Sequence, residues 1–143
     1  MYIQQISVFV ENKPGNLSEL TSFLAGNNIN LRALEVADAS DYGLIRIIVD
    51  DPYTTLTTLK DNEWICNMTE VIGVKFPDEP GSMAKTMKIL ADADISVEYC
   101  YAFLAKKSDD ALMIFRVEDN KKVASLLKEN GIKLIKQDDL SDM

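Results

Sequence analysis

Hydrophobic and polar residues alternate near the start of the chain and again about 66 residues later. Alternation of this kind predicts a strand with one face in a core. Each stretch runs into a Pro-Gly turn and then into apolar residues at helical spacing, which predicts a helix closed by "GNN" in the first copy and "DAD" in the second. The apolar positions are Ile6, Val8, Val10, then Leu17, Leu20, Phe23 and Leu24 in the first copy, and Ile72, Val74, Phe76, then Met83, Met87, Leu90 and Ala91 in the second.

The remainder of each copy also follows one pattern. The segments "INLRALEVA" and "ISVEYCYAFLA" predict second strands, and the polar stretches "DASDYG" and "KKSDD" predict hairpin loops that lead into the third strands "LIRIIV" and "LMIFRV". Asp51 and Asp119 are typical N-caps, because a carboxylate accepts hydrogen bonds from the free N–H groups of a first helical turn. They predict short second helices, and "WICNM" and "IKLIK" predict the fourth strands.

The chain is therefore expected to be a β-α-β-β-α-β unit built twice. This is an α+β fold of two ferredoxin-like units, with both helices of each unit on one face of an antiparallel sheet. No linker rich in Gly, Pro or Ser separates the copies, and we place the boundary between residues 1–69 and 70–143. An offset of 66 pairs Pro14/Pro80, Gly15/Gly81, Leu24/Leu90, Ala25/Ala91 and Ile29/Ile95, and an offset of 68 pairs Asp51/Asp119, Leu59/Leu127, Lys60/Lys128 and Asn62/Asn130.

The predicted third strands are apolar on both faces. Leu44 and Ile48 lie opposite the core positions of the first copy, and Leu112 and Ile114 do so in the second. A sheet covered by helices on one side only is expected to be polar on the other. We therefore expect the second face to be buried, either by a homodimer or higher assembly, which we favour, or by packing within the chain alone.

Composition excludes several functions. The chain carries 23 acidic and 15 basic residues, for a net charge of −8, which argues against binding to nucleic acid or to anionic membranes. No apolar run is long enough to span a membrane, and the N-terminus lacks signal-peptide features, so we expect a cytoplasmic protein. With no histidine, and with Cys66 and Cys100 far apart, the sequence predicts no metal site, no cofactor and no catalytic residue.

The two Pro-Gly turns are the candidate binding sites. Proline holds the preceding residue extended, and glycine permits a sharp entry into the helix, whose first N–H groups lack internal partners and favour a carboxylate. Asn12 and Asp78 before the turns, and Asn30 and Ser96 at the second strands, are expected to flank the same end of each unit and to take an ammonium group. The alternative is a purely structural strand-to-helix turn in which Asn16 and Ser82 are ordinary caps.

"ENKPGNLSELTSFLAGNNINL" and "PDEPGSMAKTMKILADADISVEYCYAF" resemble the opening of the ACT domain, with its strand, D/N-x-P-G turn, helix and "G-x-N-I". The whole chain resembles the small free-standing paired-ACT proteins. The resemblance implies effectors such as amino acids bound at interfaces between ACT units. It also implies the ligand-binding positions Asn12, Lys13, Pro14, Gly15, Asn16, Leu17 and Asn30 in the first copy, and Asp78, Glu79, Pro80, Gly81, Ser82, Met83 and Ser96 in the second.

The chain departs from the family pattern in two ways. No histidine stands before either turn, and the second copy has "DADIS" where glycine and asparagine are common. We therefore expect the first turn to be the better amino-acid site and the second to be mainly structural.

Three functions fit these features. We favour a non-catalytic regulator whose amino-acid effector shifts a packing equilibrium read by a partner enzyme of amino acid metabolism. A protein interaction module without a ligand is the second. The third is a small ferredoxin-like hydrolase, which is disfavoured because neither turn contains an arginine; Arg46 and Arg116 are expected to be ion-paired on third strands. The acidic tail "KQDDLSDM" is expected to be frayed and solvated, with capping of an interface as the alternative.

Overall fold

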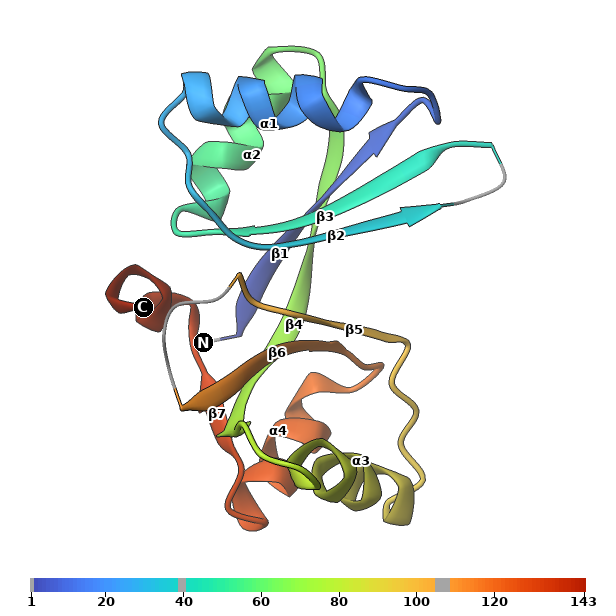
Figure 1. The fold of residues 1–143 in the computed structure, drawn as a ribbon, viewed down its shortest axis with the longest axis vertical. Helices are drawn as coiled ribbons and strands as arrows, with labels where there is room; N and C mark the ends of the chain where they lie inside the picture. The colour runs from blue at the N-terminus through green and yellow to red at the C-terminus, as the bar shows by residue number, and fades with distance from the viewer. Residues whose placement is uncertain (1, 39–40, 105–108) are drawn as a thin grey trace. The chain divides into compact units, whose positions relative to one another are not determined.

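The computed structural model of the chain describes residues 2–38, 41–104 and 109–143. Its elements follow the β-α-β-β-α-β order twice, with one added helix at the end (Figure 1). The chain divides into two compact units, which we call the N-terminal unit, Gln4–Thr69, and the C-terminal unit, Glu70–Met143 with the start of the chain through Ile3. The described residues do not include 39–40 of the first predicted hairpin or 106–108 of the second. They also do not include Ala105, the last residue of the predicted second strand in the second copy.

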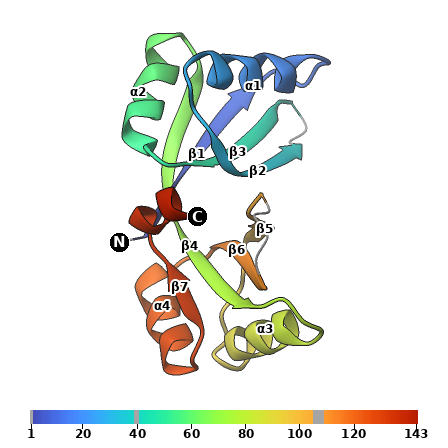
Figure 2. The same ribbon diagram turned by 60° about the vertical axis from the view of Figure 1, so that its left-hand side comes forward.

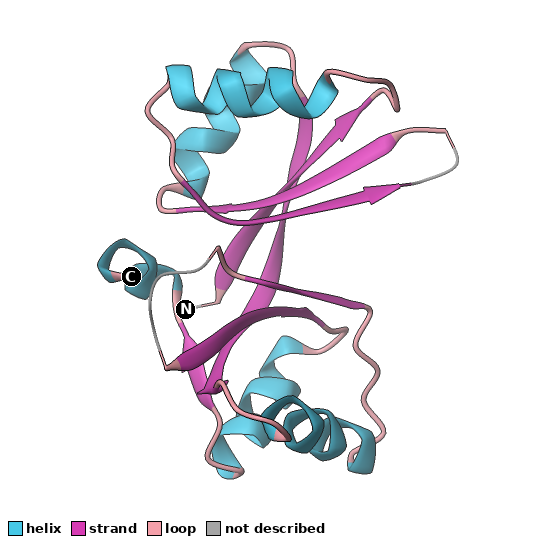
Figure 3. Ribbon diagram, viewed as in Figure 1, coloured by secondary structure: helices cyan, strands magenta, loops and turns pink. Residues whose placement is uncertain are grey.

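The N-terminal unit is a four-stranded antiparallel sheet with two helices. Its strands lie in the order β2-β3-β1-β4, and the pairs Ile6↔Ile47 in β1–β3 and Val36↔Ile45 in β2–β3 mark the register. Both helices contribute to one hydrophobic core on a single face of the sheet (Figure 3). The elements are β1 (Ile3–Val10), α1 (Asn16–Gly26), β2 (Leu31–Asp38), β3 (Gly43–Val49), α2 (Pro52–Asp61) and the first part of β4 (Ile65–Pro77).

The C-terminal unit repeats this arrangement. Its strands lie in the order β7-β4-β6-β5, with Val74 paired to Met113 of β6 and to Leu134 of β7. Side chains from α3 and α4 share one core with β4 and β6, and both helices cover the same face (Figure 2). The elements are the second part of β4, α3 (Ser82–Asp92), β5 (Tyr99–Ala102), β6 (Asp110–Arg116), α4 (Asn120–Glu129), β7 (Lys133–Ile135) and the 3-10 helix η1 (Gln137–Asp142). The predicted α+β fold of paired ferredoxin-like units is confirmed.

The start of the chain belongs to the C-terminal unit rather than to the first repeat. Tyr2 packs against the C-terminal core. A side-chain carbon at Gly73 would lie 2.5 Å from Ile3 Cδ1 and 3.0 Å from Ile135 Cβ. Only glycine therefore allows β4 to pass this closely beneath Ile3 and Ile135. The predicted first segment, residues 1–69, differs from the N-terminal unit by these first residues.

The predicted N-caps of the second helices are confirmed. Asp51 accepts a hydrogen bond from the Thr54 amide at 3.1 Å, and Asp119 accepts one from the Lys122 amide at 3.0 Å. Pro52 lies at the start of α2, where its missing N–H group needs no partner, so it also favours a helix that begins at this position.

Two sequence predictions were wrong in detail. The second strand of the C-terminal unit is only four residues long, Tyr99–Ala102, although apolar residues extend beyond it on both sides. The tail is not frayed: it forms η1, in which Asp139 accepts a hydrogen bond from the Lys136 amide and Leu140 is fully buried. Two apolar residues, Leu140 and Met143, in an acidic segment were too weak a signal to predict this ordered end.

Candidate functional site

The first Pro-Gly turn is closed around the carbonyl oxygen of Glu11. The Lys13 amide and the Asn16 side-chain amide both donate to that oxygen. Gly15, with φ of 90°, is the N-cap of α1 and provides no side-chain hydrogen bond. Among the described residues, the amides of Asn16, Leu17 and the following serine have no backbone acceptor. The turn thus presents several unpaired N–H groups at the positive end of α1.

The second turn has nearly the same backbone. Gly81, with φ of 92°, is the N-cap of α3, and the Glu79 amide donates to the Pro77 carbonyl at 3.0 Å. The Ser82 amide is already used, since it donates to the Glu79 carbonyl at 3.2 Å, whereas the amide of Met83 has no backbone acceptor in the described part of the chain. The alternative that Asn16 and Ser82 act as ordinary side-chain caps is wrong, because glycine occupies both cap positions.

Side chains at the first turn are exposed and partly engaged with one another. Lys13 and Glu11 form an ion pair at 2.8 Å, and this hydrogen bond lowers the pKa of the Glu11 carboxyl and raises the pKa of Lys13. Leu17 is 39% exposed, although leucine at helical spacing predicts burial. The first turn therefore combines free amides with an exposed apolar side chain.

The structure does not bring the second-strand residues to the turns within either unit. Asn30 follows the C-terminus of α1 and Ser96 follows the C-terminus of α3, while the turns precede the N-termini of these helices (Figure 1). An 11-residue helix is about 16 Å long. The expectation that they flank the same end was wrong, because a helix between two strands carries the chain to the opposite end of the sheet.

A pocket of about 340 Å³ lies beside the second turn. Glu79 and Ser82 of the predicted site line it, together with residues that the sequence prediction missed. The missed polar and glycine residues come from β4, α3, β6, the loop between α4 and β7, and β7 itself: Lys75, Lys85, Asp110, Asn130, Gly131 and Lys133. Lys75 and Asp110 approach to 3.5 Å. A comparison of charges between the two copies was the signal that could have drawn attention to these lysines.

Ser96 lines a different pocket, of about 220 Å³, with acidic neighbours that include Glu98 and Glu118. In the N-terminal unit, a shallow pocket of about 440 Å³ is lined by Glu19, Glu63 and the tilted ring pair of Phe23 and Trp64, but by no residue of the first turn. Trp64 also packs against the core of the N-terminal unit.

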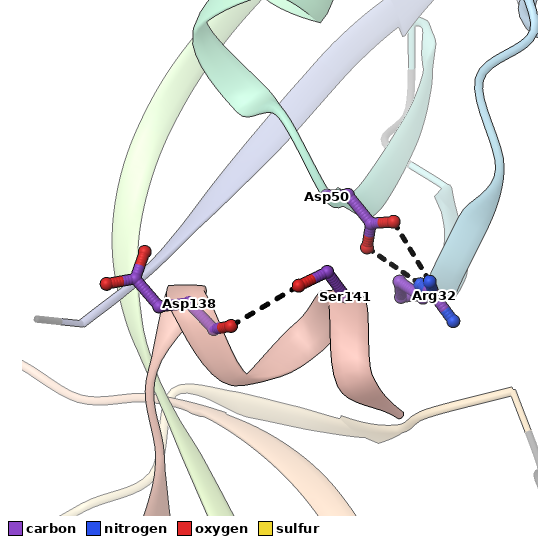
Figure 4. A network of polar contacts seen from close by, with 4 residues as sticks. All are labelled: Arg32, Asp50, Asp138 and Ser141. Carbon is purple, nitrogen blue, oxygen red and sulfur yellow. Dashed lines mark hydrogen bonds and ion pairs between the residues drawn. The ribbon is translucent and has the colours of Figure 1, made fainter.

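The arginines are held by carboxylates. Arg32 binds Asp50 through two hydrogen bonds of 2.8 and 2.9 Å (Figure 4), and this contact raises the pKa of Arg32. On the third strands, Arg46 pairs with Glu35, and Arg116 lies 3.5 Å from Glu98. The predicted ion pairing of Arg46 and Arg116 is confirmed.

The cysteines are free and half-buried, and burial raises the pKa of the Cys66 thiol. In residues 2–38, 41–104 and 109–143, no group of three or more acidic or cysteine side chains is placed to hold a metal ion. None of the helices in this part of the chain has the length and apolar character that crossing a bilayer requires.

Two ferredoxin-like units, each with a glycine-capped Pro-Gly corner at the same position, define a tandem repeat of one small-domain type. The chain belongs to the ACT domain pair family, whose sequence model matches residues 1–143. No match is found among curated proteins.

Solved structures agree with this assignment. The crystal structure of protein BT0572 from Bacteroides thetaiotaomicron is similar at 38% identity and a TM-score of 0.91, covering 100% of this chain and 98% of that one. The ligand-free regulatory subunit of aspartate kinase from Thermus thermophilus is similar at 14% identity and a TM-score of 0.64, covering 90% of this chain and 93% of that one. At 14% identity, the similarity to the kinase subunit shows that the two proteins share a fold and shows nothing further.

Proposed function

We propose that this protein is a non-catalytic regulator that binds a small effector, an amino acid or a similar metabolite, at its Pro-Gly corners. The observation that carries the proposal is the pair of glycine caps in a chain that belongs to the ACT domain pair family. In the described part of the chain, the amides of Asn16 and Leu17 in α1 and of Met83 in α3 have no backbone acceptor. Unpaired amides at a helix N-terminus favour a carboxylate. Ligand-binding positions are proposed at residues 12–17 and 78–83, with Asn30 and Ser96 contributed where a neighbouring ACT unit brings them to a turn.

The pocket beside Glu79 and Ser82 changes the ranking of the two turns. The sequence favoured the first turn, but the second has an adjacent space of a size suited to a small molecule. We therefore propose the second turn as a working site and not only a structural repeat. We further propose a cytoplasmic homodimer that responds to the effector and acts on a partner enzyme of amino acid metabolism; its ACT units would be residues 1–69 and 70–143.

A thermal-shift panel of the proteinogenic amino acids tests this function. A ligand at 100 times its dissociation constant stabilises the folded state by about 2.7 kcal/mol. A rise in melting temperature with one amino acid, absent with its N-acetyl amide, would support recognition of a zwitterion. A folded protein that responds to none of them would leave the regulator proposal unsupported, and self-association without any ligand response would favour the interaction module.

A further inference from the structure

The pocket beside the second turn is lined by three lysines from three different elements. Lys75 lies on β4, Lys85 on α3 and Lys133 on β7, and Glu79 and Asp110 are the carboxylates in the same lining. The volume of about 340 Å³ falls in the range of small-molecule pockets, which begins at roughly 300 Å³. The lining thus carries three positive and two negative side chains, for a net charge of +1, in a protein whose net charge is −8.

These lysines are not equally available to a ligand. Lys75 has a carboxylate neighbour, because its ammonium nitrogen lies 3.5 Å from Asp110. Among the described residues, no carboxylate oxygen lies within 4.0 Å of the ammonium nitrogen of Lys85 or of Lys133. Glu79 likewise forms no ion pair in this part of the chain. Within the described ranges, two cations and one anion of the lining are therefore without an oppositely charged partner.

The other repeat shows that the fold does not require these cations. In the sequence alignment of the two copies, Lys75 corresponds to Phe9, Lys85 to Glu19 and Lys133 to Ile65. The pocket at the related place in the N-terminal unit is lined by Glu19 and Glu63 beside an aromatic pair. The N-terminal unit thus forms the same fold with an acidic and aromatic lining at this place. The fold therefore does not require the three lysines, which are specific to the pocket of the C-terminal unit.

We propose that the pocket of the C-terminal unit binds a small dicarboxylate that also carries an ammonium group, which is the chemistry of an acidic amino acid. Lys85 and Lys133 each pair with one ligand carboxylate, and Glu79 pairs with the ammonium. A neutral amino acid would satisfy only one of the two lysines, which gives the pocket a basis for discrimination. This assignment rests on the proposed regulatory function and narrows its ligand class.

Isothermal titration of the full chain with aspartate, glutamate, succinate and alanine at low ionic strength tests the assignment. The variants are Lys85→Gln and Lys133→Gln, with Lys88→Gln as the matched control, because Lys88 lies on the same helix, pairs with Asp92 and does not line the pocket. We expect an acidic amino acid to bind more tightly than alanine. We expect each pocket variant to weaken that binding about tenfold, since each removes one charge-assisted contact at a partly exposed site, and the control to change it by less than about twofold.

The outcomes separate this inference from the general function. Tight binding of a neutral amino acid with weak binding of the acidic ones would overturn the dicarboxylate assignment and leave the regulator proposal standing. Equal losses in Lys85→Gln and Lys88→Gln would overturn the location. If succinate binds as tightly as aspartate, the role of Glu79 is wrong. No binding by any amino acid to the folded chain would contradict both proposals. Lys85 and Lys133 are exposed, so unchanged circular dichroism melting of their variants is the expected folding control.

Discussion

Replacement of Gly81 by alanine isolates the backbone requirement of the second turn. A side-chain carbon built at Gly81 meets no heavy atom within 4 Å, so the substitution creates no clash. The cost is conformational, because φ is 92° and an L-residue with a side chain is disfavoured there by about 1–2 kcal/mol. Gly81→Ala should therefore lower the free energy of unfolding by about that amount.

Gly26 provides the matched comparison in the same fold. It closes α1, has no positive φ, and has open space where the new methyl group would lie. Gly26→Ala should stabilise the protein by about 0.4–1 kcal/mol, because alanine reduces the entropy of the unfolded chain. Urea unfolding followed by circular dichroism measures both changes, at an m-value that should stay constant.

An unchanged midpoint for Gly81→Ala beside a stabilised Gly26→Ala would refute the idea that the turn depends on a left-handed glycine. The same variant tests function. If the glycine also aims the free Met83 amide at an effector, Gly81→Ala should reduce the thermal shift that the effector produces. A loss of stability with full ligand response would show that the corner is structural only.

Three further predictions concern packing and the thiol. Gly73→Ala should destabilise by about 1–3 kcal/mol in urea unfolding, because its methyl group would press on Ile3 and Ile135; a neutral result would contradict the close approach at β4. Leu140→Ala should cost about 2–4 kcal/mol by the same measurement, whereas a frayed tail would give no change. Burial raises the pKa of the Cys66 thiol, so the stabilising contribution of the buried thiol should be fully present below the pKa of an unfolded thiol and should be lost as pH rises through the folded pKa. Cys66→Ala should remove this loss of stability at alkaline pH. Near pH 8, native Cys66 should react with a thiol reagent more slowly than unfolded Cys66.

Much of the fold followed from short-range patterns. Asp51 and Asp119 cap their helices within three residues of their own positions, and Gly15 and Gly81 set a backbone angle at a single residue. Interactions of this range depend on neighbours in the chain, and a repeated pattern at two places strengthens each prediction. The paired ferredoxin-like order was therefore available from the sequence.

The candidate site was only partly predictable. Residues of the second turn were identified, but Lys75, Lys85 and Lys133 are separated by up to 58 positions and meet only when β4, α3 and β7 pack together. Closeness in the sequence also led to a wrong prediction about Asn30 and Ser96. Both residues follow their turns closely in the chain, but the intervening helices place them at the other end of each unit.

The sequence by itself determined the repeat, the glycine corners, the helix caps and the family, because each depends on local chemistry or on a pattern repeated along the chain. Only the tertiary structure decided that the tail ends in an ordered 3-10 helix, that the first residues join the C-terminal unit, and that charged side chains gather beside the second corner. These features arise from packing between segments that are far apart in the chain, and the sequence around one position does not show which distant residues will contact it in the folded protein.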